Sequence, residues 1–434
     1  MHPVYLNVVD VWLQSMDKTK INAALFQDLK AVLDVINHEL PLHKLEKYNM
    51  DGNSLRWFES YLKGRHQCVQ VESAFSPYLP VPWGVPQGSI LGPLLFLLYI
   101  NELPEVTKKA GDDEKEVTEQ SNVIIFADDN TPTTSNHDPE ELMKDIKVDA
   151  DKITEWFHEN DMVCSGEKTK LLLITSRANR SAKLIGNPKS IVVNDELKQE
   201  TSSEKLLGIV VNNSCNWKNH LYGDSENKGL LKELSQRVGV LRRLRKYVPD
   251  KKFRQIVNGV YISKQIYGLT VFGGLWGLPG ATMDEETRIN TMTTKEDMRK
   301  MQVLHNSVMR IMCNERYDTP TTILLRKTNQ LSIHQLVAYH SGNQVYNINK
   351  NKFPKYHFRR LFGIENEPEN IETRSLTNQV SRIDFNSSLA RGSFFFQASR
   401  MWNALPTSVK RSPNIDIFKK QSRAWVQGNV SVRP

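Results

Sequence analysis

The sequence predicts an α+β protein, and three observations support this fold class. Val123 to Phe126 is an apolar strand that runs into two adjacent acids, Asp128 and Asp129, and then into a polar turn. Strand-like and helix-like stretches alternate over roughly the first half of the chain. From Trp217 onward, apolar residues recur at helical spacing, so we expect long helices there.

The composition is that of a globular protein, and the net charge favours an anionic partner. The 434 residues are 39% hydrophobic and 24% charged, which excludes disorder and suggests two or three domains. The formal net charge of +8 favours a polyanionic partner such as nucleic acid. The four cysteines form no CxxC pair, so the sequence indicates neither a zinc knuckle nor a disulfide framework.

We expect the protein to act in the nucleus or cytoplasm rather than in a membrane or outside the cell. The N-terminus lacks the basic and apolar pattern of a signal peptide. The longest apolar run, Ile90 to Ile100, is interrupted by Gly92 and Pro93 and is too short to span a bilayer.

The first part of the chain is predicted to alternate helices and strands. The predicted order is a helix over 1–19, a buried strand over Ile21–Leu29 with Asp28 near its end, a helix over Ala31–Tyr48, a helix over 53–63 that Gly64 stops, and a strand-like stretch over His66–Phe75. In the helix over Ala31–Tyr48, we expect Leu40, Leu42, Leu45 and Tyr48 to face inward.

A loop rich in Gly and Pro, Trp83–Ser89, precedes a predicted buried helix over Ile90–Asn101. The next elements are predicted to be a solvated loop over Pro104–Ser121, the strand and turn at Val123–Asn130, an amphipathic helix over Asp138–Asn160, a strand over Leu171–Thr175 and several short strands within Leu184–Val211.

The long helices after Trp217 carry a basic cluster. An apolar stripe from Leu231 to Leu244 is surrounded by basic residues: Arg237, Arg242, Arg243, Arg245 and Lys246. A solvated helix face explains such charges in general, but the clustering of one sign favours a surface that binds phosphate. Gly280–Thr294 is predicted to be a loop, and 295–434 to be mostly helical with an aromatic patch near Phe394–Phe396 and Trp402.

The acids suggest metal-assisted chemistry. Asp28 and the pair Asp128–Asp129 lie at the ends of two predicted strands, so they could meet at one place. Adjacent carboxylates repel one another unless a cation lies between them, and Mg²⁺ prefers such oxygen ligands. Two metal ions held in this way suit phosphoryl transfer. Taken alone, the acid pair fits a simple turn at a strand end equally well.

Several motifs together resemble the reverse transcriptases of non-LTR (LINE, jockey-like) retrotransposons. The stretch from Asp28 to Asp34, with His38, resembles their first catalytic motif. Gly84–Pro93 (GVPQGSILGP) resembles the second almost letter for letter, and Phe126–Asp129 (FADD) resembles the catalytic hairpin. The matches continue in order with Trp156–Phe157, Lys168–Thr169, Leu207–Ile209, Leu241–Leu244 and Trp402–Pro406.

The resemblance implies a polymerase palm, in which an antiparallel sheet is backed by helices, followed by a helical thumb and a mostly helical C-terminal region. The implied domains are a palm over 1–176 with a remnant of fingers, a β-rich connection over 177–222, a thumb over 223–330 and a C-terminal region over 331–434. The implied activity is RNA-directed DNA synthesis with an RNA template, a DNA primer and deoxynucleoside triphosphates.

The resemblance also assigns roles to residues. Asp28, Asp128 and Asp129, with the backbone of Leu29, would hold two Mg²⁺ ions, which Mn²⁺ could replace. Lys168 would be the general acid. Leu33, Gln87 and Gly88 would contact nucleotide and template, and the basic helix carrying Arg237, Arg242, Arg243, Arg245 and Lys246 would follow the phosphates of the primer and template.

The sequence departs from the family pattern at several places. Leu33 stands where the family has an aromatic residue that excludes the ribose 2′-OH, Ser165 replaces an Asn, and Asn130 replaces a Thr. We expect a truncated copy that lacks most of the fingers, unless a protein partner supplies them, and that has weak polymerase activity or none. The alternatives are a non-catalytic remnant that binds RNA or an RNA–DNA hybrid, an RNA-directed RNA polymerase, and a protein with chance acid pairs.

Overall fold

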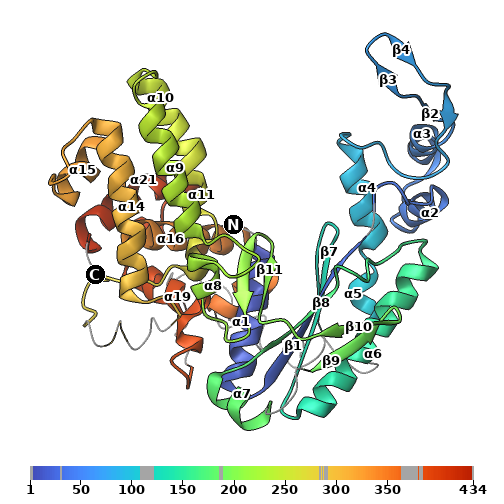
Figure 1. Cartoon of the computed structure of the whole chain (residues 1–434), viewed down its shortest axis with the longest axis horizontal. Coiled ribbons are helices and arrows are strands. Elements are labelled where there is room, and N and C mark those ends of the chain that lie inside the picture. The colour runs from blue at the N-terminus through green and yellow to red at the C-terminus, as the bar shows by residue number, and fades with distance from the viewer. Residues whose placement is uncertain are drawn as a thin grey trace. The chain divides into compact units, whose positions relative to one another are not determined.

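The computed structural model describes residues 3–29, 32–107, 122–184, 189–282, 285, 287, 292–362, 380 and 385–432. The chain forms two compact units, and we describe each by itself. Residues 20–202 form the sheet unit, and residues 1–19 with 203–434 form the helical unit (Figure 1). The division into four domains given above stays a prediction.

The sheet unit is built on a four-stranded antiparallel sheet with the strand order β6-β7-β1-β8. Its elements are β1 (Ile21–Asp28), α2 (Glu39–Lys47), α3 (Gly52–Leu62), β2 (His66–Gln67), β3 (Gln70–Val71), β4 (Ala74–Phe75), β5 (Leu79–Pro80), α4 (Leu91–Ile100), α5 (Leu103–Val106), β6 (Asn122–Phe126), β7 (Asp129–Asn136), α6 (Pro139–Glu159), β8 (Lys170–Ile174), α7 (Arg177–Lys183), β9 (Ser190–Val193) and β10 (Glu196–Gln199).

The strand β1 lies in the interior because β7 and β8 pair with its two edges and α6 packs on one face. Ile21 and Leu25 on β1 belong to the same apolar cluster as Leu142 and Ile146 on α6. The helix begins where its sequence predicts, because the Asp138 carboxylate caps its first turn and accepts a hydrogen bond of 2.7 Å from the Glu140 backbone N–H. The predicted α+β fold class is confirmed.

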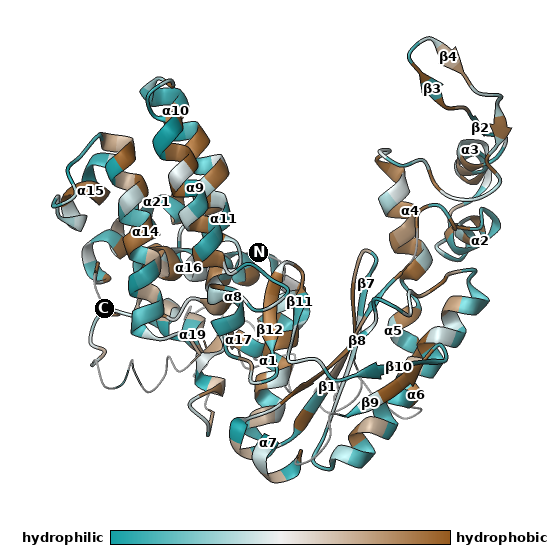
Figure 2. Ribbon diagram, viewed as in Figure 1, coloured by the Kyte–Doolittle hydropathy of each residue, from teal (hydrophilic) through white to brown (hydrophobic). Residues whose placement is uncertain are grey.

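Three predictions for the sheet unit are wrong in part. The helix predicted over Ala31–Tyr48 begins only at Glu39, and Tyr48 is exposed rather than inward-facing. The helix α4 is buried on one face only, since Ile90, just before it, and Leu94 and Leu97 within it are exposed although the helix is mostly hydrophobic (Figure 2).

The polar stretch after the two acids is a strand rather than only a turn. β7 has the sequence DNTPTTSN, which contains no large apolar residue, yet it pairs with both β6 and β1. Its buried threonines use their hydroxyls within the sheet, as when Thr133 donates to the Ala23 carbonyl at 3.0 Å. Most of the predicted loop over 104–121 lies outside the described residues.

The helical unit contains the short hairpin β11–β12 and a set of helices. Its described elements are α1 (Pro3–Asp17), β11 (Ser203–Leu206), β12 (Ile209–Asn212), α8 (Lys218–Tyr222), α9 (Leu230–Leu244), α10 (Asp250–Val257), the π-helical turn η1 (Asn258–Ile262), α11 (Ser263–Ile266), α12 (Leu269–Phe272), α14 (Lys295–Cys313), α15 (Thr321–Thr328), α16 (Ile333–Asn351), α17 (Lys355–Phe362), the 3-10 turn η3 (Ala390–Gly392), α19 (Phe394–Ala404), α20 (Thr407–Lys410) and α21 (Ile415–Asn429).

Aromatic residues fill the interior of the helical unit. The predicted aromatic patch over Phe394–Phe396 is buried in α19, and Trp402 is fully buried. The Trp402 ring lies 5.9 Å from the ring of Phe418 on α21, and the Phe418 ring stacks on Tyr346 of α16 at 4.3 Å. These contacts join α16, α19 and α21 into one core.

The helix α1 joins the helical unit through a buried acid. Asp10 is buried and accepts hydrogen bonds from Gln14 at 2.7 Å, Tyr356 at 3.0 Å and Arg360 at 3.1 Å. Burial nevertheless raises the pKa of the Asp10 carboxyl, while Arg360 lowers it. This polar network fixes α1 against α17, far along the sequence.

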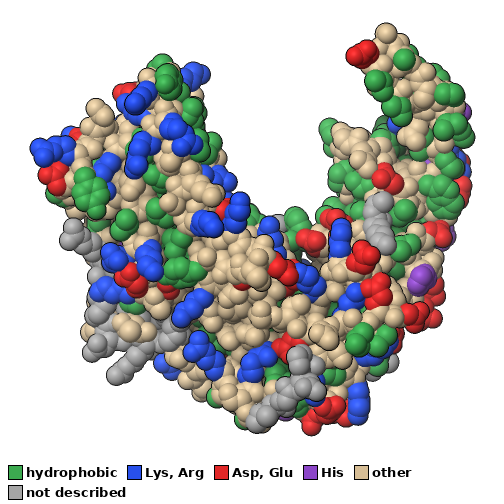
Figure 3. Space-filling view, in the orientation of Figure 1, with side chains coloured by type: hydrophobic (Ala, Val, Ile, Leu, Met, Phe, Trp, Pro, Cys, Tyr) green, Lys and Arg blue, Asp and Glu red, His purple; other side chains and the backbone are tan. Residues whose placement is uncertain are grey.

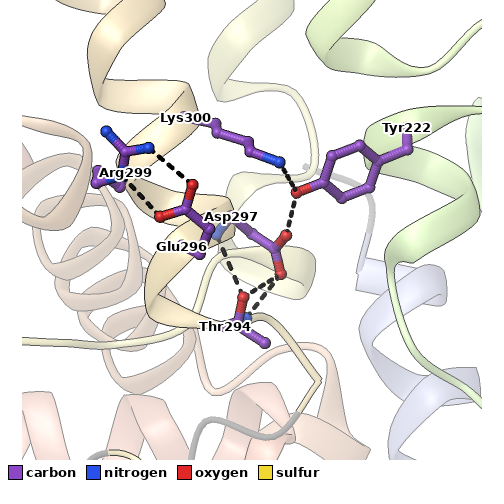
Figure 4. Close-up of polar contacts among 6 residues, drawn as sticks. All are labelled: Tyr222, Thr294, Glu296, Asp297, Arg299 and Lys300. Carbon is purple, nitrogen blue, oxygen red and sulfur yellow. Dashed lines mark hydrogen bonds and ion pairs between the residues drawn. The ribbon is translucent and has the colours of Figure 1, made fainter.

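The start of α14 is tied to α8 by a second polar cluster (Figure 4). Thr294 and Asp297 form a reciprocal capping box, in which the Asp297 carboxylate accepts from the Thr294 backbone N–H at 2.8 Å. The Tyr222 hydroxyl donates to the other Asp297 oxygen at 2.5 Å, and Lys300 donates to that hydroxyl at 3.2 Å.

In the described part of the chain, none of the helices is both long and apolar enough to cross a bilayer.

Candidate active site

The acids predicted to form the site lie at one end of the sheet. Asp28 is the last residue of β1 and is directly opposite Asp129, the first residue of β7, in the antiparallel register. Asp128 lies in the two-residue turn between β6 and β7, after Ala127, whose φ of +52° gives the left-handed conformation that such tight turns need. Strand pairing therefore brings together residues that are a hundred positions apart in the sequence.

The Asp129 carboxyl is affected by the charges of its two acidic neighbours. Burial raises the pKa of the Asp129 carboxyl, and the neighbouring charges of Asp128 and Asp28 raise it further. A group in this setting favours protonation or the approach of a cation. Both Asp128 and Asp129 are exposed, so a solvated cation can reach them.

Lys168 supplies a positive charge to this cluster. Its Nζ lies 2.6 Å from Oδ2 of Asp28, and this hydrogen bond raises the pKa of the Lys168 ammonium. The loop that carries Lys168 is anchored to the end of β1, because the Ser165 N–H donates to the Asp28 carbonyl at 2.8 Å and Leu29 forms an isolated bridge with Cys164. Backbone contacts thus hold the loop, while the Lys168 side chain is exposed and is held by its ion pair with Asp28.

The donor set fits a hard divalent cation, but the side chains are not arranged as a closed cage. Carboxylate oxygens from Asp28, Asp128 and Asp129 are the ligands that Mg²⁺ prefers. Within the described residues, no three His, Cys, Asp or Glu side chains are grouped closely enough to hold a metal ion as they stand. Because Asp28 is engaged by Lys168, a metal would have to displace that ammonium to bind all three acids.

The glycine-rich loop packs against the segment that follows β1. The Gly84 N–H donates to the Ile36 carbonyl at 2.8 Å, and the Val85 N–H donates to the Leu33 carbonyl at 2.7 Å. His38 Nε2 lies 2.8 Å from the Gly84 carbonyl, which fixes the other side of the same glycine. These contacts explain why residues 32–38 form turns instead of the predicted helix.

One side-chain contact links the segment after β1 to the glycine-rich loop. Gln87 Nε2 donates to Asp34 Oδ1 at 2.8 Å, and both side chains are exposed to solvent. Leu33 lies beside Asp34 and packs partly against the apolar core. Sequence reasoning did not assign a role to Asp34, although its place in the first motif could have drawn attention to it.

We expect Gly84→Ala to destabilise the chain by about 2 kcal/mol or more, because Gly84 combines a left-handed backbone with no space for a side chain. Its φ is +85°, and a Cβ there would lie 2.9 Å from the Asp34 Cα and from the Leu33 carbonyl oxygen. Urea unfolding measures the change. Gly64→Ala is the matched control, since Gly64 has a φ of +71° and no neighbour within 4 Å. Equal losses in the two variants would contradict a packing role for Gly84.

The predicted phosphate-binding residues lie on α9 and just after it, in the helical unit. They differ in exposure and in hydrogen bonding. Arg242, Arg243 and Lys246 are exposed. Arg237 instead donates to the Val260 carbonyl, and the Arg245 guanidinium is held by three acceptors within its own unit. Three of the five N–H donors of Arg245 are thus used in structural contacts, and its role in binding phosphate stays a prediction.

Comparisons with known proteins agree with the geometry. Residues 7–211 match the family model described as reverse transcriptase (RNA-dependent DNA polymerase). The RNA-directed DNA polymerase from mobile element jockey of Drosophila funebris is 22% identical over 60% of this chain and 28% of the relative. The probable RNA-directed DNA polymerase from transposon X-element of Drosophila melanogaster is 24% identical over 49% of this chain and 22% of the relative.

A further relative is the probable RNA-directed DNA polymerase from transposon BS of Drosophila melanogaster, which is 23% identical over 76% of this chain and 33% of its own length. The chain thus spans a third or less of these curated relatives. Among solved structures, apo telomerase from Candida tropicalis aligns with a TM-score of 0.37 and 12% identity, over 71% of this chain and 50% of that chain.

The matched residues 7–211 include the whole cluster of acids, the glycine-rich loop and Lys168. The first two motifs, the catalytic hairpin and the paired ends of β1 and β7 therefore lie within the matched range, whereas Leu241–Leu244 and Trp402–Pro406 lie outside it. Over residues 7–211 the chain is thus similar to reverse transcriptases, and the relatives that it matches are RNA-directed DNA polymerases of mobile elements such as jockey, X-element and BS.

Proposed function

We propose that the chain is an RNA-directed DNA polymerase that extends a DNA primer by two-metal nucleotidyl transfer. The observation that carries this proposal is the pairing of Asp28 with Asp129 beside Asp128, at the end of a sheet that also anchors Lys168. Phosphoryl transfer needs few protein groups beyond ligands that place metal ions and a group that handles the proton.

The carboxylates of Asp28, Asp128 and Asp129, with the Leu29 carbonyl, would hold two Mg²⁺ ions or Mn²⁺ in their place. Bound metal would lower the pKa of the primer hydroxyl and stabilise charge on the phosphoryl oxygens. The raised pKa of Asp129 supports this assignment, because that carboxyl stands among negative charges that a cation would relieve.

Lys168 would serve as the proton donor to the leaving pyrophosphate. Its ammonium is held in the protonated form by Asp28, and its exposed side chain can turn toward a nucleotide once a cation replaces it at that acid. Leu33 would lie beneath the sugar, and Gln87 and Gly88 would contact the incoming nucleotide and the template. Asp34 would position the Gln87 amide through their hydrogen bond.

The partners that this function requires are an RNA template, a DNA primer and deoxynucleoside triphosphates. The exposed side chains of Arg242, Arg243 and Lys246 would bind phosphates of the primer and template. We place this activity in the nucleus or cytoplasm, where such templates occur.

Primer extension on an RNA template with Mg²⁺ tests the proposal. We expect slow, distributive addition of deoxynucleotides by the purified chain, and faster addition when Mn²⁺ replaces Mg²⁺. Parallel reactions with ribonucleotides separate a DNA polymerase from an RNA polymerase. Preferential ribonucleotide addition, or no addition with either metal at any enzyme concentration, would contradict the proposal.

A second candidate function is a non-catalytic remnant that binds RNA or an RNA–DNA hybrid. The ion pair between Lys168 and Asp28 favours it, because the lysine neutralises one acid without any metal. In that case the acids would have no role in binding, and hybrid affinity would be the same with Mg²⁺ and with a chelator.

We expect Leu33→Phe to raise the preference for deoxynucleotides over ribonucleotides by about tenfold, because a planar ring under the sugar excludes the 2′-OH better than a leucine does. Single-nucleotide addition with matched deoxy and ribo substrates measures the ratio. Val32→Phe is the control, since Val32 is a neighbouring partly buried residue of the same segment. An unchanged ratio in Leu33→Phe would show that Leu33 does not contact the sugar.

A further inference from the structure

The turn between α9 and α10 is strongly basic, and its residues after Lys246 have no assigned ligand. Between Arg242 and Arg254 the sequence holds seven basic side chains and a single acid, Asp250. Figure 3 shows Lys and Arg side chains gathered at the ends of these two helices. The exposed cations are Arg242, Arg243, Lys246, Lys251 and Lys252.

Arg245 holds this turn in one conformation. Its Nε donates to the Ile311 carbonyl at 3.1 Å, its Nη1 to the Val248 carbonyl at 3.3 Å, and its Nη2 to Asp250 Oδ1 at 2.5 Å. The same guanidinium lies 5.1 Å from the centre of the Phe253 ring. Arg245 therefore neutralises the one acid of the segment and fixes the backbone on both sides of Tyr247.

Tyr247 is presented to solvent by this turn. The residue is 82% exposed, although a tyrosine buries a large apolar ring where it can. Its backbone N–H is bound to the Leu244 carbonyl at 3.0 Å, whereas the described residues offer its ring no aromatic or cationic neighbour. The equally exposed Tyr317 differs, because Arg310 lies over its ring at 5.2 Å.

We propose that Tyr247 stacks on the base of an unpaired nucleotide while Arg242, Arg243, Lys246, Lys251 and Lys252 bind the adjacent phosphates. An exposed aromatic ring on a held turn, beside a cluster of exposed cations, is the combination that binds single-stranded nucleic acid. The strand must be unpaired, because a base offers its face to a protein ring only when it is not stacked within a duplex. The inference rests on the proposed function, which supplies a single-stranded template.

Equilibrium binding to short oligonucleotides tests the proposal without metal ions or nucleotides. We would measure fluorescence anisotropy with a labelled single-stranded RNA of about 12 nucleotides, and with an abasic strand that keeps its phosphates. The wild-type chain should prefer the RNA over the abasic strand by about tenfold, and Tyr247→Ala should abolish that preference. Tyr247→Trp should retain it, whereas Tyr247→Leu should lose it, because leucine has no planar face.

Two further variants separate the contribution of the Tyr247 ring to binding from that of the basic side chains. Tyr317→Ala is the matched control, because it removes another exposed tyrosine of the same unit and should leave both affinities unchanged. Lys251→Gln with Lys252→Gln should weaken binding to both strands alike and reduce the salt dependence of binding. Circular dichroism of each variant shows whether the helices are retained.

The outcomes separate this inference from the polymerase proposal. If Tyr247→Ala binds RNA and the abasic strand as the wild type does, the ring serves another partner, such as a protein, and the inference is wrong even when the chain extends primers. Equal loss of affinity for both strands would also overturn stacking. If Tyr247→Ala loses the preference for bases while the wild type extends no primer, the inference stands and the polymerase proposal fails.

Discussion

Asp128→Asn is expected to reduce primer extension by more than about a hundredfold while leaving the affinity for a primer–template hybrid unchanged. The substitution keeps the size of the side chain and removes a negative charge that contributes to the raised pKa of the Asp129 carboxyl. Because Asp128 is exposed in the turn between β6 and β7, the loss of its charge should not unfold the sheet.

The measurement is single-turnover nucleotide addition, together with hybrid binding by anisotropy in the presence of Mg²⁺. Asp151→Asn is the control, because it removes the same charge from an exposed position on α6, where Asp151 pairs with Lys147. Extension by Asp128→Asn at the wild-type rate would show that the acid pair is an ordinary turn. If neither the wild type nor Asp128→Asn extends the primer, and both bind the hybrid with equal affinity, the result would favour the non-catalytic remnant.

The contact between Lys168 and Asp28 would have different consequences in a polymerase and in a non-catalytic remnant. As it stands, its ammonium satisfies Asp28 and allows the acids to remain close without a metal. A polymerase needs that contact to be exchanged for a divalent cation, which is feasible because the lysine is on the surface and its loop is held by other contacts, including the hydrogen bond from the Ser165 N–H to the Asp28 carbonyl. The same contact in a remnant would simply be permanent.

Patterns of apolar residues allowed much of the sheet unit to be predicted. The strand β1, the helix α6 and the strand β8 were found because each buries a regular apolar face in the same core. The approach of Asp28 to Asp129 could be predicted because both lie at the ends of strands that pair, and the loop at Gly84 because Gly and Pro are frequent there. These features depend on local sequence and on short-range geometry.

The parts that were missed depend on contacts that no local pattern records. The strand β7 is polar, and its place between β6 and β1 is set by pairing along both edges rather than by apolar residues. Residues 32–38 have helical spacing, but their carbonyls bind the Gly84 loop instead. Arg245 resembles its basic neighbours in sequence, and its structural contacts include the carbonyl of Ile311 on α14, which is far along the chain.

Acid is expected to unfold the helical unit as the pH falls from about 6.5 to about 4, because three of its buried histidines stay neutral in the folded state. Burial lowers the pKa of His220, His305 and His334 to about 4, below the ordinary value of 6.5. Between these pH values the unfolded chain binds protons that the folded chain does not. Each histidine then lowers the free energy of unfolding by up to about 1.4 kcal/mol per pH unit.

His334 gives the sharpest test of this dependence, because neither of its ring nitrogens has a hydrogen-bond partner among the described residues. Urea unfolding followed by circular dichroism at several pH values measures the slope. His334→Leu should flatten it by about one proton and should not destabilise the chain at neutral pH, because an apolar residue replaces an unsatisfied polar one. The control, His43→Leu, removes an exposed imidazole. A slope that His334→Leu leaves unchanged would show that the acid response arises elsewhere, for instance at the carboxylates that neutral pH keeps charged.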